Sequence, residues 1–261
     1  MRSIAQQIKI IQQYKKIGLM THVVAGYPSI AGTVQLVKVM EKVGVDFIEI
    51  QIPFSDPIAD GPLIMKANDI ALMNGMNTEK AFVLVEQLSK KVKIPLLIMG
   101  YYNTVFQYGV KKFCEKARKV GARAVIIPDI PVDEEEKEHF IRYCNRCKCP
   151  AIRVLSPTST DERIAINLQV ASEFVYCTAV AGTTGVRNEL NQNTQNFLKR
   201  IKTHTDLPLA VGFGISKPEH VKMLVGYADI AVVGSAVIQI IEEKGIDAVG
   251  NYLRSLLEKP L

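Results

Sequence analysis

The chain of 261 residues is 48% hydrophobic and carries a net charge of +6, so it has enough apolar material for a large core. Its lysines are spread along helix-like segments without interleaved aromatic residues, which favours a solvated basic surface over nucleic-acid binding. No window approaches the roughly 18 apolar residues of a membrane span, and the amino-terminal residues lack the apolar core of a signal peptide. Five cysteines, an odd number, are typical of a reducing compartment. We therefore expect a soluble, cytoplasmic protein.

The predicted elements alternate between helices and strands along the chain. Ser3 is a candidate N-cap for an amphipathic helix that carries Ile4, Ile8 and Ile11, and we expect this helix to cover the core. Strands are predicted at residues 19–25, 46–52, 95–100, 124–128, 151–155, 174–178, 207–212 and 229–234. Helices are predicted near residues 30–43, 63–73, 78–91, 109–120, 133–147, 160–170, 191–203, 217–226, 236–243 and 246–258.

Eight predicted strands separated by helices favour a closed barrel of parallel strands. Parallel strands need crossover connections, which are right-handed, and eight units are the number that closes a (β/α)8 TIM barrel. We expect one such domain over residues 1–261, with an extra N-terminal helix and an extra helix after the second strand. An open doubly wound sheet is the alternative, because spacing alone does not prove closure.

The second predicted strand runs into a loop rich in carboxylates. At a period of two, its isoleucines share one face while Glu49 points to the other face, together with Phe47 and Gln51. Prolines at positions 53, 57 and 62 restrict the loop, so Asp56 and Asp60 should be held in place. Glu49 is either a structural charge or a general acid/base, and Asp60 can reach the same cavity. Because barrel enzymes act at the carboxyl ends of their strands, we predict a site here.

The last two strand ends are typical of a phosphate site. Gly212 and Gly214 would let backbone amides approach a ligand, and Gly234 with Ser235 opens a helix whose free amides and dipole favour an anion. Loops after the seventh and eighth strands are where TIM barrels commonly bind phosphate. Gly-Phe-Gly is not a dinucleotide fingerprint, because the third glycine and the ribose-binding acid are missing. The polar loop at 181–193 is predicted to be a lid, with an ordinary surface loop as the alternative.

Residue types and spacing disfavour other chemistries. No predicted strand carries a lysine near its carboxyl end, which argues against a Schiff-base aldolase. The four histidines show no metalloenzyme spacing, so no metal is expected. Cys144, Cys147 and Cys149 have no second cysteine pair, and a structural interpretation is favoured for them.

The loop at residues 53–62, Pro-Phe-Ser-Asp-Pro-Ile-Ala-Asp-Gly-Pro, preceded by Glu49, closely resembles the signature of the tryptophan synthase alpha subunit family. The resemblance covers essentially the full chain and continues in order at residues 101–103, 108–109, 128–132, 212–216 and 233–236. The ten-residue loop motif is highly specific, whereas the glycine motifs are shared by many phosphate barrels.

The resemblance implies a carbon–carbon lyase of tryptophan biosynthesis, which cleaves indole-3-glycerol phosphate to indole and glyceraldehyde 3-phosphate. The reaction is a retro-aldol cleavage that needs no cofactor in this chain. Glu49 would be the acid/base serving the ring carbon and the side-chain hydroxyl, and Asp60 would hold the ring N–H. Tyr176 would lie near Glu49, and Phe213 would pack on the indole. Thr184 in the lid would contact Asp60 on closure. The implied phosphate ligands are Gly185, Gly214, Gly234 and Ser235.

The resemblance also implies a partner, a pyridoxal-phosphate beta subunit that makes tryptophan from indole and serine in an α2β2 assembly. The segments implied to face that subunit contain Pro53, Asp56, Asn103 and Pro131. Two alternatives stay open. The chain could be a stand-alone indole-3-glycerol phosphate lyase, or a weakly catalytic barrel that activates or scaffolds a beta-like partner.

Several positions depart from the family pattern around the site. Residue 51 is Gln where the family usually has Gly, and strand parity places it in the cavity of Glu49, where it could restrict the pocket or hydrogen-bond the acid. His22 stands where an aromatic residue is common, and Tyr27 replaces the usual Asp. The lid region departs at Ala179, Val180 and Thr183.

Overall fold

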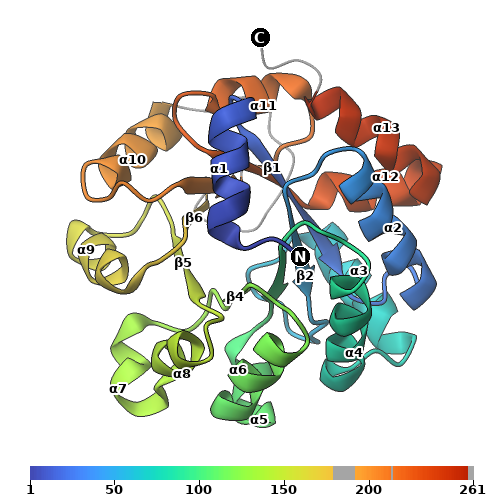
Figure 1. Ribbon diagram of the computed structural model, residues 1–261, viewed down its shortest axis with the longest axis horizontal. Helices are drawn as coiled ribbons and strands as arrows, with labels where there is room; N and C mark the ends of the chain where they lie inside the picture. Colours follow the sequence, from blue (N-terminus) through green and yellow to red (C-terminus); the bar gives the residue numbers. More distant parts are fainter. Residues whose placement is uncertain (179–191, 213, 258–261) are drawn as a thin grey trace.

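Eight short strands carry apolar residues on both faces, as a parallel sheet covered on both sides requires. They are β1 (Gly18–Val24), β2 (Phe47–Gln51), β3 (Leu96–Met99), β4 (Ala124–Ile126), β5 (Ala151–Leu155), β6 (Val175–Thr178), β7 (Leu209–Gly212) and β8 (Ile230–Val233). The computed structural model describes residues 1–178, 192–212 and 214–257. Each strand pairs in parallel with the next, and β8 pairs with β1, so the sheet closes. Closure confirms the TIM barrel and excludes the open sheet (Figure 1).

Most predicted helices are present with ends displaced by one or two residues, and they surround the strands (Figure 1). They are α2 (Ile30–Lys42), α3 (Pro62–Met73), α4 (Thr78–Ser89), α6 (Val110–Lys119), α9 (Asp161–Val170), α10 (Gln192–Lys202), α11 (Pro218–Leu224), α12 (Ser235–Lys244) and α13 (Ile246–Leu257). Both α3 and α4 follow β2, which confirms the predicted extra helix.

Two stretches of helix differ from the prediction. The helix predicted at 133–147 is divided into η1 (Val132–Glu134), α7 (Glu135–Glu138) and α8 (Phe140–Arg146), because His139 takes a left-handed conformation with φ 54°. The Glu135 carboxylate then accepts hydrogen bonds from the first amides of α8, at Ile141 and Arg142. Helix α5 (Tyr102–Tyr108) was not predicted. Its first amide, of Tyr102, donates to the Asp129 carboxylate at 2.9 and 3.0 Å, a cap that lies 27 residues away.

The N-terminal helix α1 (Ile4–Tyr14) covers one end of the barrel. The Ser3 side chain accepts from the Gln6 amide, and the Gln6 side chain accepts from the Ser3 amide, so the predicted cap is a complete capping box. Ile4 and Ile11 join the cluster that fills the barrel interior, together with Phe47. Figure 1 shows α1 lying across the ring of strands, which confirms its role as a cover for the core.

The period-two pattern of β2 is also confirmed. Ile48 and Ile50 belong to the layer between strands and helices, whereas Phe47 belongs to the interior cluster. Glu49 and Gln51, which have the same parity as Phe47, are therefore directed into the barrel near its carboxyl end. The second strand thus delivers two buried polar groups to the interior.

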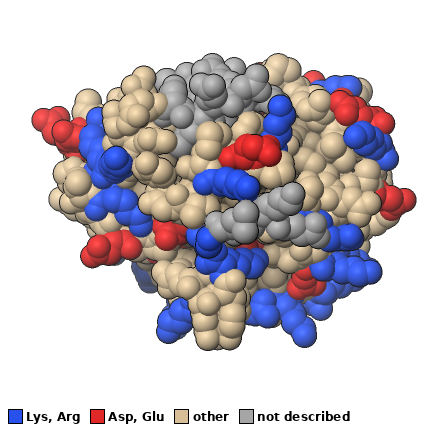
Figure 2. All heavy atoms as spheres, turned by 90° about the horizontal axis from the view of Figure 1, so that it is seen from above, with Lys and Arg blue, Asp and Glu red and all other residues tan. Residues whose placement is uncertain are grey.

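Charged side chains of both signs are spread over the described surface. Figure 2 shows Lys and Arg among Asp and Glu on the visible face, as expected for a solvated surface. Among the described residues, none of the helices is long and apolar enough to span a bilayer.

Candidate active site

A cavity opens at the carboxyl ends of the strands, and all eight strands contribute a residue to its wall. We call it the barrel-end cavity. Its wall is largely apolar, and the apolar residues come from several strands and from α3: Ile64, Met99, Ile126, Pro128, Val154 and Val232. Its polar residues are His22, Glu49, Asp60, Tyr176, Thr178 and Ser235. The cavity therefore suits a flat apolar group that carries a few polar atoms.

Glu49 is the most unusual member of this wall. Its side chain points inward from β2 and is only 3% exposed. Within the described part of the chain, its Oε2 atom is buried without a hydrogen-bond partner. The nearest basic group is His22, whose Nδ1 lies 3.5 Å from Oε2, longer than a well-formed hydrogen bond. A buried carboxylate oxygen without a hydrogen-bond partner, on a residue that lines a cavity, is typical of a functional acid/base rather than a satisfied structural charge.

A chain of polar contacts leads from this carboxylate to Asp60. His22 on β1 is the register partner of Glu49 on β2. The Nε2 atom of His22 lies 2.8 Å from Oε1 of Gln51. The Gln51 amide nitrogen in turn donates to Oδ2 of Asp60 at 2.7 Å. The Gln51 side chain thus hydrogen-bonds His22 and Asp60, and the bond to Glu49 that its sequence position suggested is not among its contacts in the described residues.

The electrostatic environment of these groups is far from that of water. Burial lowers the pKa of His22, but the nearby Glu49 and Asp60 carboxylates and the Gln51 contact more than offset this, and the net pKa is raised. Burial raises the pKa of Asp60, although His22, Gln51 and Tyr101 act in the opposite direction.

Tyr176 enters the cavity from β6. Burial and the charges of Glu49 and Asp60 raise its pKa well above the usual value, so the phenol keeps its proton at neutral pH. A Cβ atom at Gly212 of β7 would lie 2.9 Å from the Tyr176 hydroxyl oxygen. Gly212, which we predicted to admit a ligand, therefore also makes room for the tyrosine.

Short turns and an aromatic neighbour hold the loop that carries Asp60. The Asp60 amide donates to the Pro57 carbonyl at 2.9 Å. The Tyr101 hydroxyl accepts from the Ala59 amide at 3.1 Å, and its ring stacks on Phe54 with centroids 5.3 Å apart. Sequence reasoning placed Tyr101 at a strand end but gave it no role. Its position just after β3 was the feature of the sequence that could have indicated a place near the site.

Small residues after β7 and β8 also line the cavity. Gly214 has a positive φ of 64°, which favours glycine. Gly234 is the N-cap of α12, and Ser235 is its first residue. All three line the barrel-end cavity with the two acids. The amide end of a helix in such a position can hold an anion.

Some residues singled out from the sequence are either outside the described residues or placed away from the barrel-end cavity. Thr184, Gly185, Phe213 and the lid departures Ala179, Val180 and Thr183 lie outside the described residues, as does the predicted lid up to residue 191. Tyr27 is buried away from the cavity, with its hydroxyl 3.5 Å from Glu242 Oε1.

The residues implied to face a partner lie around the rim of the same barrel end. Pro53 and Asn103 line a neighbouring groove with Phe54 and Tyr108. Asp56 and Pro131 are exposed. Two exposed apolar side chains follow β2 and β3, where they are accessible to another protein: Ile58 (78% exposed) and Phe106 (56% exposed).

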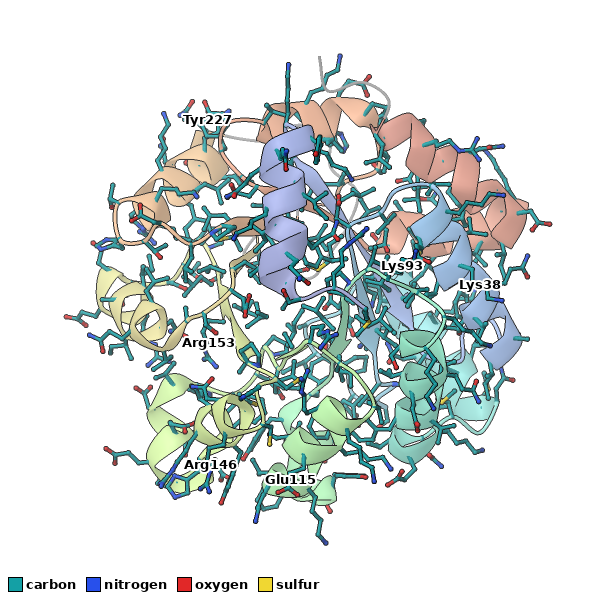
Figure 3. The ribbon with its side chains drawn as sticks, viewed as in Figure 1. Lys38, Lys93, Glu115, Arg146, Arg153 and Tyr227 are labelled. Carbon is teal, nitrogen blue, oxygen red and sulfur yellow. The ribbon has the colours of Figure 1, made fainter. Side chains whose placement is uncertain are left out.

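Other clusters look structural. Arg153 of β5 lies on the outer side of the barrel, where its guanidinium donates to Asn167 of α9 and to the Ile130 carbonyl (Figure 3). The Cys114 and Cys144 sulfur atoms are buried 3.4 Å apart between α6 and α8. In the part of the chain that is described, His, Cys, Asp and Glu side chains form no group of three that could hold a metal ion.

Comparison with known proteins identifies relatives over almost the whole chain. The family model described as tryptophan synthase alpha chain matches residues 8–258. The chain is 43% identical to the tryptophan synthase alpha chain of Desulfotalea psychrophila, covering 95% of this chain and 98% of that one. It is 38% identical to the tryptophan synthase of Saccharomyces cerevisiae, covering 92% of this chain and 34% of that protein.

Solved structures agree with these relatives. A structure from Aquifex aeolicus VF5 superimposes with a TM-score of 0.90 at 33% identity, covering 99% of this chain and 98% of the other. A structure of Mycobacterium tuberculosis tryptophan synthase gives a TM-score of 0.90 at 27% identity, with the same coverage of each chain.

Proposed function

Because the chain belongs to the tryptophan synthase alpha chain family, we propose that its barrel-end cavity cleaves indole-3-glycerol phosphate to indole and glyceraldehyde 3-phosphate. One observation carries this proposal. Glu49 is a buried carboxylate that lines the cavity and has an oxygen without a hydrogen-bond partner among the described residues, and Asp60 lines the same cavity.

The reaction breaks the bond between the indole ring and the glycerol phosphate side chain. The ring carbon must gain a proton, and the adjacent side-chain hydroxyl must lose one as it becomes the aldehyde. Glu49 is the acid/base for both transfers, because its carboxylate lines the cavity and one of its oxygens has no hydrogen-bond partner among the described residues. Asp60 accepts a hydrogen bond from the ring N–H and stabilises the positive charge that develops on the protonated ring.

The substrate fits the cavity in one orientation. Its indole ring lies against the apolar wall near the acids, and Phe213 packs on the ring. Its phosphate lies on Gly214, Gly234 and Ser235, where the N-terminus of α12 supports the negative charge. Gly185 contributes to the same phosphate site, and Thr184 contacts Asp60 when the lid is closed. Tyr176 remains a neutral phenol beside Glu49.

The rim of the cavity binds a beta subunit in an α2β2 assembly. The groove lined by Pro53 and Asn103 supports this, as do the exposed Asp56 and Pro131. In the yeast relative, the matching region is about a third (34%) of a longer tryptophan synthase. Pyridoxal phosphate belongs to the partner and not to this chain. Five free thiols suit a reducing compartment, which is the cytoplasm.

An assay of indole release by the purified chain, with and without a beta subunit, tests this function. A rate that rises on addition of the beta subunit supports the proposal in full. A high rate that the beta subunit leaves unchanged supports a stand-alone lyase and overturns the assembly. If the folded chain releases no indole under either condition, the catalytic proposal fails in favour of a scaffold.

A further inference from the structure

The side chains of His22 and Gln51 connect the two acids of the barrel-end cavity. The contacts run from Glu49 Oε2 to His22 Nδ1 at 3.5 Å, from His22 Nε2 to Gln51 Oε1 at 2.8 Å, and from Gln51 Nε2 to Asp60 Oδ2 at 2.7 Å. All four side chains are buried. We call these four residues the polar bridge.

The amide of Gln51 fixes the direction of the hydrogen bonds in the bridge. An amide has a donor nitrogen on one side and an acceptor oxygen on the other. With its nitrogen toward Asp60, Gln51 donates to an ionised carboxylate, and its oxygen must accept a proton from His22 Nε2. The opposite orientation would need a proton on Asp60 and none on Nε2. Gln51 thus couples the tautomer of His22 to the ionisation of Asp60.

The orientation of Gln51 leaves two protonation states for the pair formed by His22 Nδ1 and Glu49. If His22 is neutral with its proton on Nε2, Nδ1 is an acceptor and Glu49 must carry a proton to face it. If Glu49 is ionised, Nδ1 holds that proton and the pair is an ion pair. In both states the pair shares one proton, on Glu49 or on His22, although 3.5 Å is longer than a well-formed hydrogen bond.

We propose that His22 and Gln51 are positioning residues: they keep Asp60 as a hydrogen-bond acceptor and hold one proton between His22 Nδ1 and Glu49 Oε2, available to the acid/base. This inference rests on the proposed function for the roles of Glu49 and Asp60. The 3.5 Å separation suits such a role, because Glu49 is near the imidazole without being captured by it and can still turn to a substrate.

The groups around His22 are consistent with the bridge. In the described chain, the ionisable groups that act on His22 are Glu49 from β2 and Asp60 from the following loop, and both raise its pKa. Tyr176 from β6 lines the same cavity but keeps its proton at neutral pH. From β8 and α12 the cavity receives the uncharged residues Val232, Gly234 and Ser235.

Nitrogen NMR of the imidazole rings tests the bridge independently of catalysis. The chain has four histidines, and the His22 signals are assigned by their loss in His22→Phe. We expect His22 to carry its proton on Nε2 when neutral and to titrate above its ordinary value. In Glu49→Gln, its pKa should fall, because the carboxylate that raises it is gone. A titration of His22 that Glu49→Gln leaves unchanged, or a neutral ring protonated on Nδ1, overturns the inference.

Substitutions at position 51 separate bridging from simple filling of the pocket. Gln51→Met keeps the length of the side chain but cannot hydrogen-bond, and Gln51→Gly removes it. If the bridge operates, both variants should lower kcat by about tenfold, an effect of the size found for coupled contacts. Both should also shift the pH profile of kcat in the same way, with little change in KM. If Gln51→Met behaves like the unsubstituted chain, Gln51 only shapes the pocket and the inference fails.

A double-mutant cycle completes the test. If His22 and Gln51 act as one unit, His22→Phe with Gln51→Met should be no slower than the slower single variant, whereas independent roles would multiply the two losses. Multiplied losses overturn the inference. Failure of the proposed function is recognised separately: Glu49→Gln would then retain lyase activity, while the NMR titration of His22 still reports whether the bridge exists.

Discussion

Tyr176 on β6 and Gly212 on β7 occupy adjoining space, because a Cβ atom at position 212 would lie 2.9 Å from the Tyr176 hydroxyl oxygen. Gly212→Ala should therefore displace the ring, lower lyase activity and cost about 1–3 kcal/mol of stability through overpacking. Denaturation and indole-release assays measure both effects.

Two variants control this test. Gly100→Ala places its Cβ at an ordinary 3.7 Å from Ile127 and should be nearly neutral. Tyr176→Phe removes the hydroxyl oxygen, the atom closest to a Cβ at position 212. The Gly212→Ala/Tyr176→Phe double variant should therefore lose less stability than the sum of the losses in the two single variants. Strict additivity would contradict the steric explanation.

Glu49→Gln should preserve the fold and reduce cleavage by about 10²-fold or more, the usual scale for a positioned acid/base. The matched control is Glu242→Gln on α12, a similar substitution at a residue that pairs with Lys66 outside the cavity. Steady-state kinetics of indole release compare them, with circular dichroism to monitor folding. Near-normal turnover in Glu49→Gln would disprove the catalytic assignment.

Asp60→Asn should lower kcat/KM by about 10- to 100-fold, because a neutral amide stabilises a charged ring less well than a carboxylate does. The same substitution should raise the melting temperature at pH 7. Burial raises the folded-state pKa of Asp60 above its ordinary value of 3.8. The stability that its proton contributes is therefore complete below pH 3.8 and is lost as pH rises through the folded value.

At neutral pH the ionised Asp60 thus destabilises the fold. The gain in melting temperature from Asp60→Asn should therefore shrink as the pH is lowered toward 3.8, the ordinary pKa of the carboxyl group. Asp56→Asn, an exposed position in the same loop, serves as the control and should change neither stability nor its pH dependence. A lower melting temperature for Asp60→Asn at pH 7 would show that the carboxylate stabilises the site.

Asp46→Asn should destabilise the barrel by about 1–3 kcal/mol without changing the lyase reaction. The Asp46 carboxylate accepts from Lys15, from Gln7 and from the Leu19 amide, at the end of the barrel covered by α1. Asp229 makes a similar pair of contacts, with Lys202 and the Leu209 amide. Its side chain is 32% exposed against 2% for Asp46, so Asp229→Asn should cost less. Urea denaturation ranks the two, and equal costs would refute the role of burial.

Phe106→Ser should weaken binding of the beta subunit by about tenfold, because exposed aromatic side chains are frequent anchors of interfaces. The activity of the isolated chain should not change, since Phe106 does not line the barrel-end cavity. Tyr14→Ser removes another exposed aromatic group, at the end of α1, and should leave binding intact. Titration calorimetry with the beta subunit measures both, and equal affinities for the two variants would place the interface elsewhere.

The inward direction of Glu49 was predictable from the sequence because it depends on local geometry. Side chains of a strand alternate between faces, so the isoleucines on the outer face assign Glu49 and Gln51 to the interior. The helix after Ser3 was predictable for the same reason, since its capping box spans only four residues, from Ser3 to Gln6. Alternation of strands and helices indicated the barrel, although closure itself was observed only in the pairing of β8 with β1.

The failures involve contacts between a side chain and a helix that does not contain it. Helix α5 begins at an amide capped by Asp129, 27 residues away, and no local signal at Tyr102 indicates it. The break at His139 is stabilised by Glu135 of α7, whose carboxylate accepts hydrogen bonds from the first amides of the next helix, α8. In both cases a side chain outside the element decides where the backbone turns.

The sequence by itself determined the family signature, the alternation of elements and the inward direction of Glu49, because each is written in neighbouring residues. Only the tertiary structure decided that His22 faces Glu49, that Gln51 joins His22 to Asp60, and that Tyr101 supports the loop of Asp60. Those pairs lie on or after neighbouring strands, and the pairing of β1 with β2 and of β2 with β3 brings them within hydrogen-bonding or ion-pair distance. The period of a strand fixes which way a side chain points, but only the pairing and register of the strands fix what it meets.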